Sequence, residues 1–297
     1  MKQLLPGLIW QILWIFSWLP GFVFRFLASA VNYIVLDIFG YRKGVVHSNL
    51  KKSFPELSSD ERQEIAEKFY KHFSELFLEI ILLTRFNSKK AKRRLRFSDP
   101  EVLAGPLSRK QNIIIVGGHF GNWEYNVPMM IASGYRVLAV YKPQSSEFAN
   151  QLMKKIRQRP GVTLVPMKDS FRIISSEINN KNSPFALLLV ADQTPARVDI
   201  RFRTRFLNQD TAFFTGVEKI SKIFSMPVFF VEQLKHGFAD YEASLTLIHD
   251  GVSTTQKGDV TKKFVDILEK SIRKTPYLWL WSHRRWKYQP VELPLKP

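Results

Sequence analysis

The stretch Gln111 to Pro128, QNIIIVGGHFGNWEYNVP, decides the fold of this chain. It opens with an unbroken β-branched run, Ile113 to Val116, which is typical of a central strand covered on both faces. Two glycines follow and permit a sharp turn. His119 comes next, and Glu124 lies five residues later at the start of a predicted helix. The stretch therefore predicts a strand, a turn and a helix, with two ionisable side chains at the turn.

The pair His119 and Glu124 has the composition of a general-base site. Residues five apart do not share one face of a regular helix, but they can meet when the histidine lies in the turn and the glutamate in the first helical turn. An imidazole held by a carboxylate is the base half of a catalytic triad. No serine or cysteine nucleophile is evident beside the pair, so we expect the base to act on a substrate hydroxyl. The alternative is structural: the histidine packs and the glutamate caps the helix.

The segment GGHFGNWE, which contains His119 and Glu124, resembles the His-x4-Asp/Glu motif of the lysophospholipid acyltransferase superfamily. More narrowly, it is similar to the lipid A late acyltransferases, the lauroyl and myristoyl transferase family. The resemblance implies that His119 is the general base and that Glu124 orients it. It runs from about Leu4 to Lys287, which is nearly the whole chain.

Two further motifs of that family follow the central stretch. Arg157 matches the family's arginine, and its chemistry suits a phosphate or an oxyanion, although an ordinary surface arginine is the alternative. Asp192-Gln193 matches the family's second landmark and follows the apolar strand predicted at residues 185–190. Ligands of open α/β sheets bind at the carboxyl ends of the strands. We therefore expect Asp192 to pair with Arg157 beside the reaction centre, with Gln193 among the substrate-binding residues.

The end of the chain carries the last motif. His283, Arg284 and Arg285 resemble the family's Trp-x3-His-Arg-Arg-Phe/Trp-Lys signature. Two guanidinium groups flanked by tryptophans suit an anionic head group at an interface, and a packed aromatic terminus is the alternative. The loop at residues 195–216 resembles the Phe-rich loop that lines the family's pocket, but the family's Phe-Phe-Gly is replaced here.

The charge and the aromatic content of the chain indicate which kind of molecule it binds. The net charge is +18 with a pI near 10.0, which indicates an anionic partner. Aromatic residues make up 13% of the chain, which favours a membrane interface over a nucleic-acid duplex. No Walker A, zinc-finger or RNP-like pattern is present, so we expect no nucleic-acid partner. There is no cysteine, and no ligand spacing suggests a metal, so we expect neither a metal nor a cofactor.

The N-terminus predicts a membrane anchor. Residues 3–24 carry no charge, and a second apolar segment follows at 22–36. We interpret residues 1–40 as anchoring or interfacial helices, either a tilted span plus an interfacial helix or a monotopic hairpin, and 41–297 as the acyltransferase domain. A cleaved signal peptide and a soluble core helix are the alternatives. The basic run at 89–96 indicates either a solvated helix face or contact with head groups or an acidic carrier.

Alternating strands and helices predict an α/β fold. We expect a mostly parallel sheet with helices on both faces, which the resemblance implies is glycerol-3-phosphate-acyltransferase-like. The strands are expected at 113–116, 135–141, 162–166, 185–190, 226–233 and 241–248, and the helices at 58–80, 147–159, 171–180 and 259–274.

The resemblance implies O-acyl transfer from acyl carrier protein to a hydroxyl of a lipid A precursor, at the cytoplasmic side of a bacterial inner membrane. His119 would take the hydroxyl proton, and Arg157 or loop amides near Gly118 and Asn122 would stabilise the oxyanion. One alternative is the same transfer to another membrane lipid, a lysophospholipid or an aminolipid. The other is a non-catalytic basic membrane-binding protein.

Overall fold

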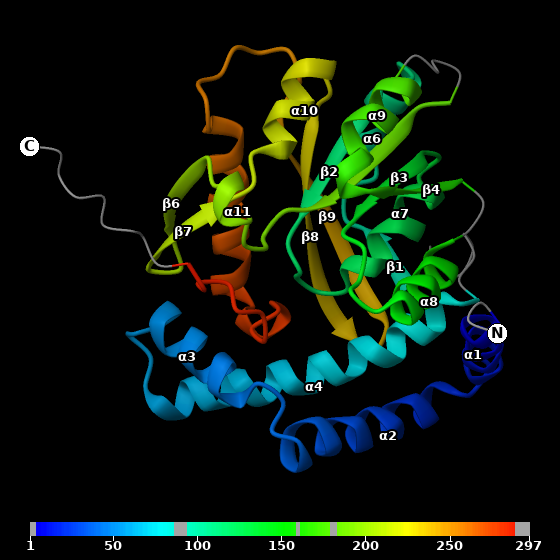
Figure 1. Cartoon of the computed structure of the whole chain (residues 1–297), viewed down its shortest axis with the longest axis vertical. Coiled ribbons are helices and arrows are strands. Elements are labelled where there is room, and N and C mark those ends of the chain that lie inside the picture. The colour runs from blue at the N-terminus through cyan, green and yellow to red at the C-terminus, as the bar shows by residue number, and fades with distance from the viewer. Residues whose placement is uncertain (1–3, 86–93, 159–160, 179–182, 289–297) are drawn as a thin grey trace, which may run out of the picture.

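A seven-stranded sheet forms the centre of the molecule (Figure 1). The computed structural model describes residues 4–85, 94–158, 161–178 and 183–288. The strands lie in the order β1, β9, β8, β2, β5, β3, β4. Their bounds are β1 Leu95–Phe97, β9 Asp240–His249, β8 Val228–Gly237, β2 Ile113–Gly117, β5 Phe185–Val190, β3 Arg136–Tyr141 and β4 Val162–Pro166. The strands from β8 to β4 run parallel, whereas β9 is antiparallel to β8 and pairs in parallel with β1.

Helices cover both faces of the sheet. Alternate residues of β2 and β5 enter different cores, because successive side chains of a strand point to opposite faces. Ile114 packs with residues of α9, α10 and α11 on one face, and Ile115 packs with residues of α6, α7 and α8 on the other. The bounds are α6 Glu101–Ser108, α7 Asn126–Ala132, α8 Glu147–Arg157, α9 Ser170–Glu177, α10 Gly216–Phe224 and α11 Asp259–Lys274. The prediction of a mostly parallel α/β sheet with helices on both faces is confirmed.

The N-terminal helices pack against one long helix of the domain. Helix α2 (Gly21–Asn32) continues into the π-helical turn η1 (Tyr33–Ile38) and lies beside α4 (Ser59–Leu83) in Figure 1. Phe24 of α2 is 1% exposed and stacks on Phe238. Helix α1 (Leu4–Phe16) contacts α8, and α3 (Lys43–Ser53) lies at the other end of α4.

The outer surface of these helices is apolar. More than half of the exposed large apolar side chains of the described residues lie between residues 5 and 39. Residues 21–38 form a helical stretch with a mean hydropathy of 1.5 and 11% of it buried, which is long and apolar enough to cross a membrane by length and composition alone. Burial of one side against α4 and exposure of the other suits an interfacial position as well as a span.

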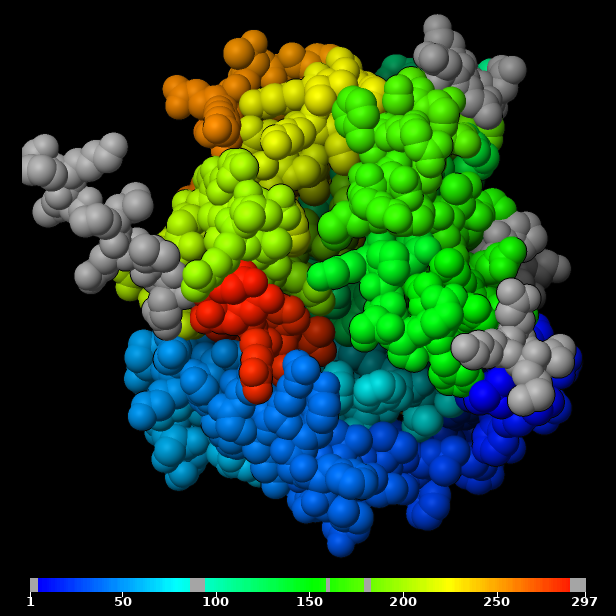
Figure 2. Space-filling model, viewed as in Figure 1, coloured from blue at the N-terminus to red at the C-terminus, as the bar shows by residue number. Residues whose placement is uncertain are grey.

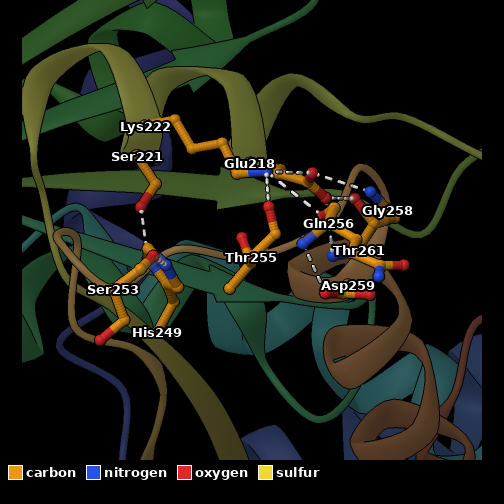
Figure 3. Close-up of polar contacts among 10 residues, drawn as sticks. All are labelled: Glu218, Ser221, Lys222, His249, Ser253, Thr255, Gln256, Gly258, Asp259 and Thr261. Atoms are coloured by element: carbon orange, nitrogen blue, oxygen red, sulfur yellow. Dashed lines mark hydrogen bonds and ion pairs between the residues drawn. The ribbon is translucent and has the colours of Figure 1, made fainter.

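A small hairpin and a buried carboxylate complete the fold. Strands β6 (Phe202–Phe206) and β7 (Gln209–Phe213) form an antiparallel hairpin where the sequence predicts a loop. In Figure 3, Glu218 of α10 accepts hydrogen bonds from the backbone N–H of Gly258 (2.8 Å) and from Thr261 at the start of α11. In the same figure His249 Nδ1 lies 3.1 Å from the hydroxyl of Ser221. It also accepts the backbone N–H of Gly251 at 2.9 Å, which gives this histidine a structural role.

Element boundaries agree closely with the sequence predictions. The strands at 162–166 and 185–190 and the helix at 259–274 have the predicted ends. The sequence analysis did not predict β1, which has only three residues. It also did not predict the hairpin, because the alternation of Phe202, Thr204 and Phe206 with two arginines lies inside a stretch interpreted as a loop. Most of the basic run at 89–96 lies outside the described residues, and its end forms part of β1. The short 3-10 turns are η2 Trp123–Tyr125, η3 Met167–Asp169, η4 Arg197–Asp199 and η5 Pro276–Leu278.

Candidate active site

The register of two neighbouring strands brings His119 to Asp192. Strands β2 and β5 are parallel, and Gly117 is paired with Val190 at their carboxyl ends. The Ala191 N–H donates to the Gly117 carbonyl at 3.0 Å, so the alignment extends past the strands. His119 and Asp192 each lie two residues beyond the last pair. Their side chains therefore meet at the carboxyl edge of the sheet, where open α/β folds bind ligands.

Asp192 holds His119 through both of its carboxylate oxygens. Its Oδ1 lies 2.6 Å from His119 Nδ1, and its Oδ2 accepts the backbone N–H of His119 at 2.8 Å. Oδ2 also accepts the indole N–H of Trp279 at 2.8 Å. Burial by itself raises the pKa of the Asp192 carboxyl, but the charge of His119 and the hydrogen bonds from His119 and Trp279 outweigh it and lower the pKa to about 2. Asp192 is therefore an ionised, buried acceptor at neutral pH.

This arrangement determines the tautomer of His119. A carboxylate can only accept a hydrogen bond, so the proton of a neutral imidazole lies on Nδ1. The Nε2 lone pair is then free to act as a base. Gln193 Nε2 lies 3.1 Å from it and donates one of its amide protons. A substrate hydroxyl that replaced this amide would meet the base at hydrogen-bonding distance.

Glu124 does not contact His119, which corrects the pairing expected from the sequence. The Glu124 carboxylate forms a two-bond ion pair with Arg157, with Nε to Oε2 at 2.8 Å and Nη2 to Oε1 as the second contact. Burial lowers the pKa of Arg157, but the charge and hydrogen bonds of Glu124 outweigh it, so the pKa lies above its usual value. The expected pairing of Arg157 with Asp192 is also wrong. Glu124 pairs with Arg157, and Asp192 pairs with His119, so the two carboxylates have exchanged their expected partners.

One cavity brings both pairs together. A space of about 190 Å³ is lined by His119, Glu124, Arg157 and Gln193. Its other walls include apolar side chains of the strands and of α7, namely Ile115, Val127, Ala139, Leu164, Leu188 and Leu189. The cavity thus combines a base, a fixed cation and an apolar lining, which is the composition expected for a site that binds an acyl chain next to a reacting carbonyl.

A match to a family model covers residues 4–288, and the model is described as bacterial lipid A biosynthesis acyltransferase. The chain belongs to this family. Relatives include the lipid A biosynthesis palmitoleoyltransferase of Escherichia coli K12, with 20% identity over 281 residues, covering 94% of this chain and 90% of the relative. The lauroyltransferase of the same strain has 22% identity over 287 residues, with 95% and 91% covered.

The family assignment makes this chain an acyltransferase of lipid A biosynthesis. A solved structure of the 1-acyl-sn-glycerophosphate acyltransferase PlsC from Thermotoga maritima is also similar, with 12% identity and a TM-score of 0.36. That likeness covers 86% of this chain and 97% of the solved chain. A similarity of this size carries no weight in assigning the site.

A buried polar network holds the turn after His119 in this acyltransferase. Glu79 of α4 is 0% exposed and accepts from Asn122 Nδ2 at 2.7 Å and from the Tyr241 hydroxyl at 2.8 Å. Gln233 of β8 accepts the Asn122 N–H at 2.7 Å and donates to the Asn122 carbonyl at 3.0 Å. Gly121 has a φ of +62, and a Cβ there would lie 2.7 Å from Gln233 Oε1. Asn122, expected at the substrate, is therefore buried and turned towards Glu79.

Glu79, Gln233 and Trp279 are site-supporting residues that the sequence analysis did not identify. Glu79 carried one signal: it falls on the buried face of α4 between Leu76 and Leu82, where an unpartnered carboxylate would be costly. Trp279 was part of the C-terminal motif but had no assigned partner. Gln233 carried no local signal, because its contacts come from a turn more than a hundred residues earlier.

The C-terminal basic motif divides into a buried and an exposed half. Arg285 is 2% exposed, donates to the Ala212 carbonyl at 2.5 Å and lies over the Phe213 ring. Burial lowers the pKa of Arg285 to about 10. A head-group contact at the surface does not fit this position, which corrects the expectation for Arg285. Arg284 is exposed, and it lines a second cavity.

His283 and Gly118 flank the His119–Asp192 pair. His283 is partly buried with its Nδ1 unpartnered, and burial lowers its pKa to about 4 against the opposing charge of Asp192. A Cβ at Gly118 would lie 2.8 Å from a methyl group of Leu268 and 3.2 Å from Asp192 Oδ2, so a larger residue there would have to displace the leucine side chain. The described part of the chain contains no group of three or more acidic or histidine side chains arranged to hold a metal ion.

Proposed function

We propose that this protein transfers a fatty acyl chain from acyl carrier protein to a hydroxyl of a lipid A precursor. The observation that carries the proposal is His119, held by ionised Asp192, at one wall of an apolar cavity. Family membership supports the lipid A acceptor. The chemistry needs no nucleophile from the protein, since the acceptor's own hydroxyl attacks the thioester.

His119 acts as the general base in this mechanism. Its Nε2 takes the proton of the acceptor hydroxyl while the hydroxyl oxygen bonds to the thioester carbonyl carbon. Asp192 holds the Nδ1–H tautomer and stabilises the imidazolium that forms. When the tetrahedral intermediate collapses, the C–S bond breaks and the imidazolium returns its proton to the leaving thiolate. Gln193 marks the place of the hydroxyl, because its amide occupies the Nε2 lone pair in the free protein.

Glu124 acts through Arg157 in this proposal. The two bonds between them fix the guanidinium in the wall of the cavity. A fixed cation stabilises negative charge that develops on the carbonyl oxygen more effectively than a mobile one, because no reorganisation is needed during the reaction. Loop amides near Gly118 are further oxyanion donors in this proposal.

The membrane and the acyl carrier protein are the proposed partners. Residues 1–40 would anchor the chain to the bacterial inner membrane, and residues 41–297 would carry out the transfer on the cytoplasmic side. The apolar surface of α1, α2 and η1 supports the anchor. Acyl carrier proteins are acidic, so the net charge of +18 would speed their encounter with this protein.

His119→Ala tests the proposal directly. Purified full-length protein is assayed with acyl carrier protein thioesters and a lipid A precursor, and the product is identified by mass spectrometry. Loss of the base should lower the transfer rate by about 10²–10⁴-fold. The melting temperature serves as a control for folding. A folded His119→Ala protein with near-normal transfer would refute the mechanism.

A further inference from the structure

A second cavity, of about 410 Å³, lies between α3, the β6–β7 turn and the C-terminal segment. Figure 2 shows the C-terminal segment lying against α3 on this side of the molecule. Its polar lining consists of Ser48, Asn49, Lys52, Gln209, Arg284 and Lys287. No aspartate or glutamate among the described residues lines it. The cavity is therefore a concentration of three cations with no anion to neutralise them.

The walls of this cavity are fixed by hydrogen bonds. Asn49 is 8% exposed and donates to the carbonyls of Trp281 (2.8 Å) and His283 (3.0 Å), which ties α3 to the C-terminal segment. Gln209 donates to the hydroxyl of Ser53 at 3.3 Å, which ties the hairpin to α3. A cavity whose walls are held in this way loses little entropy when a ligand binds.

The three cations remain available to a ligand. Lys52, Arg284 and Lys287 are all exposed, and none of them forms an ion pair within the described part of the chain. Lys287 lies 4.7 Å from the ring of Tyr288. Guanidinium and ammonium groups that converge without acidic partners are suited to phosphate, which accepts several charge-assisted hydrogen bonds.

The position of the cavity indicates a lipid head group rather than a soluble molecule. Gly44 and Val45 of its lining lie a few residues after Phe39, which is 76% exposed at the end of the apolar surface. Head groups lie at the edge of the hydrocarbon layer, so the cavity occupies the matching level.

The cavity also lies close to the reaction centre. The Leu280 N–H donates to the His119 carbonyl at 3.1 Å, and Arg284 follows four residues later. An extended chain of that length spans at most about 14 Å between the two α-carbons. One bulky head group could therefore extend from the base to this cavity.

We propose that this cavity binds a phosphate group on the head of the acceptor lipid, and so orients the acceptor with its hydroxyl towards His119. The proposal rests on the proposed function for the identity of the acceptor. Arg284 supplies the main contact, with Lys52 and Lys287 on either side. This makes Arg284 a specificity-determining residue that lies outside the catalytic cavity.

The test compares Arg284→Gln with Lys51→Gln. Lys51 is an exposed neighbour of Lys52 on α3 that does not line the cavity, so its loss removes the same charge elsewhere. Transfer is measured with the lipid A precursor and with the same precursor after phosphatase treatment. Arg284→Gln should raise the KM for the intact acceptor about tenfold with kcat nearly unchanged, since a charge-assisted contact is lost. The two proteins should not differ on the dephosphorylated acceptor.

Two binding measurements separate the sources of phosphate and do not need catalysis. Inorganic pyrophosphate should bind the full-length protein and bind Arg284→Gln at least several-fold more weakly. Vesicles of phosphatidylglycerol and phosphatidylethanolamine should bind both proteins equally. A different result would be a wild type that shows no acyl transfer to the lipid A precursor while its pyrophosphate binding still depends on Arg284. That result would refute the proposed function but would support an anion-binding site in this cavity.

Four results would overturn the proposal. They are an equal KM rise on both acceptors, an equal rise for Lys51→Gln, a rise in the KM for the acyl donor instead, and loss of vesicle binding in Arg284→Gln. The last would mean that the cavity contacts bilayer lipids in general rather than the acceptor.

Discussion

Replacing Asp192 by asparagine should reverse the tautomer of His119. Asp192 Oδ2 accepts two N–H groups, from the His119 backbone and the Trp279 indole, both at 2.8 Å. In Asp192→Asn the amide oxygen must stay at this position, because the amide nitrogen cannot accept. The NH₂ group then faces His119 Nδ1, 2.6 Å away in the wild type. Nδ1 becomes the acceptor, the proton moves to Nε2, and the lone pair needed for catalysis is lost.

Asp192→Asn should lose most of its acyl-transfer activity while its fold remains nearly unchanged. General-base catalysis contributes about 10²–10⁴-fold, and the same substitution in a Ser-His-Asp triad costs about 10⁴-fold. We expect kcat/KM for acyl transfer to fall by about 10³-fold or more. Because the two hydrogen bonds to Oδ2 are retained, the variant should remain folded, which its melting temperature and circular dichroism check.

Glu124→Gln is the matched control. It also replaces a buried carboxylate by its amide, but it acts on Arg157 and leaves the tautomer of His119 unchanged. The pH dependence of kcat/KM should keep its base-dependent limb in Glu124→Gln and lose it in Asp192→Asn. The opposite pattern, with Asp192→Asn near wild type and the limb lost in Glu124→Gln, would refute the assignment of Asp192 as the orienting residue.

Three further predictions follow from the geometry. Gly121→Ala should lower stability by about 1–3 kcal/mol in thermal unfolding, because its φ of +62 and the 2.7 Å approach to Gln233 both disfavour a side chain; an unchanged melting temperature would contradict this. Since the folded pKa of Asp192, about 2, lies below the usual aspartate value of 3.8, its contribution of about 2 kcal/mol is present above pH 4 and lost as the pH falls towards 2; acid titration of Asp192→Asn should lack this loss. Removing residues 1–38 should release the protein only partly from membranes in sedimentation, since basic surface remains; a wild-type protein found wholly in the soluble fraction would disprove the anchor.

The positions of the main strands, and their alternation with helices along the chain, could be predicted from the sequence because each of these strands carries its own local pattern. The run Ile113 to Val116 and the apolar segment at 185–190 are continuous, as buried parallel strands require. The strand that lies beside each of them could not be predicted, because neighbours in a sheet are chosen by packing across the whole chain. The hairpin β6–β7 was missed because residues 195–216 were interpreted as a pocket-lining loop, although Phe202, Thr204 and Phe206 alternate with two arginines there.

The positions of the candidate site residues at one cavity could be predicted better than their contacts. His119, Gln193, Glu124 and Arg157 all line the cavity, and Asp192 lies directly behind His119. The basic motif at the C-terminus divided differently from expectation. Arg285 became part of the core, because its guanidinium donates to the Ala212 carbonyl and lies over the Phe213 ring.

The exchanged partners of Glu124 and Asp192 have two physical causes, a local turn and the register of two strands. Spacing along the chain favoured a contact between His119 and Glu124, but residues 123–125 form a 3-10 turn that places Glu124 against the end of α8, where Arg157 lies. His119 instead contacts Asp192, which follows the neighbouring strand β5, because the pairing of Gly117 with Val190 brings these two residues together. Each buried carboxylate thereby has a partner that can be cationic, and neither charge is left unpaired. The sequence contains both carboxylates, the imidazole and the guanidinium of this arrangement, and the 3-10 turn and the strand register decide how they pair.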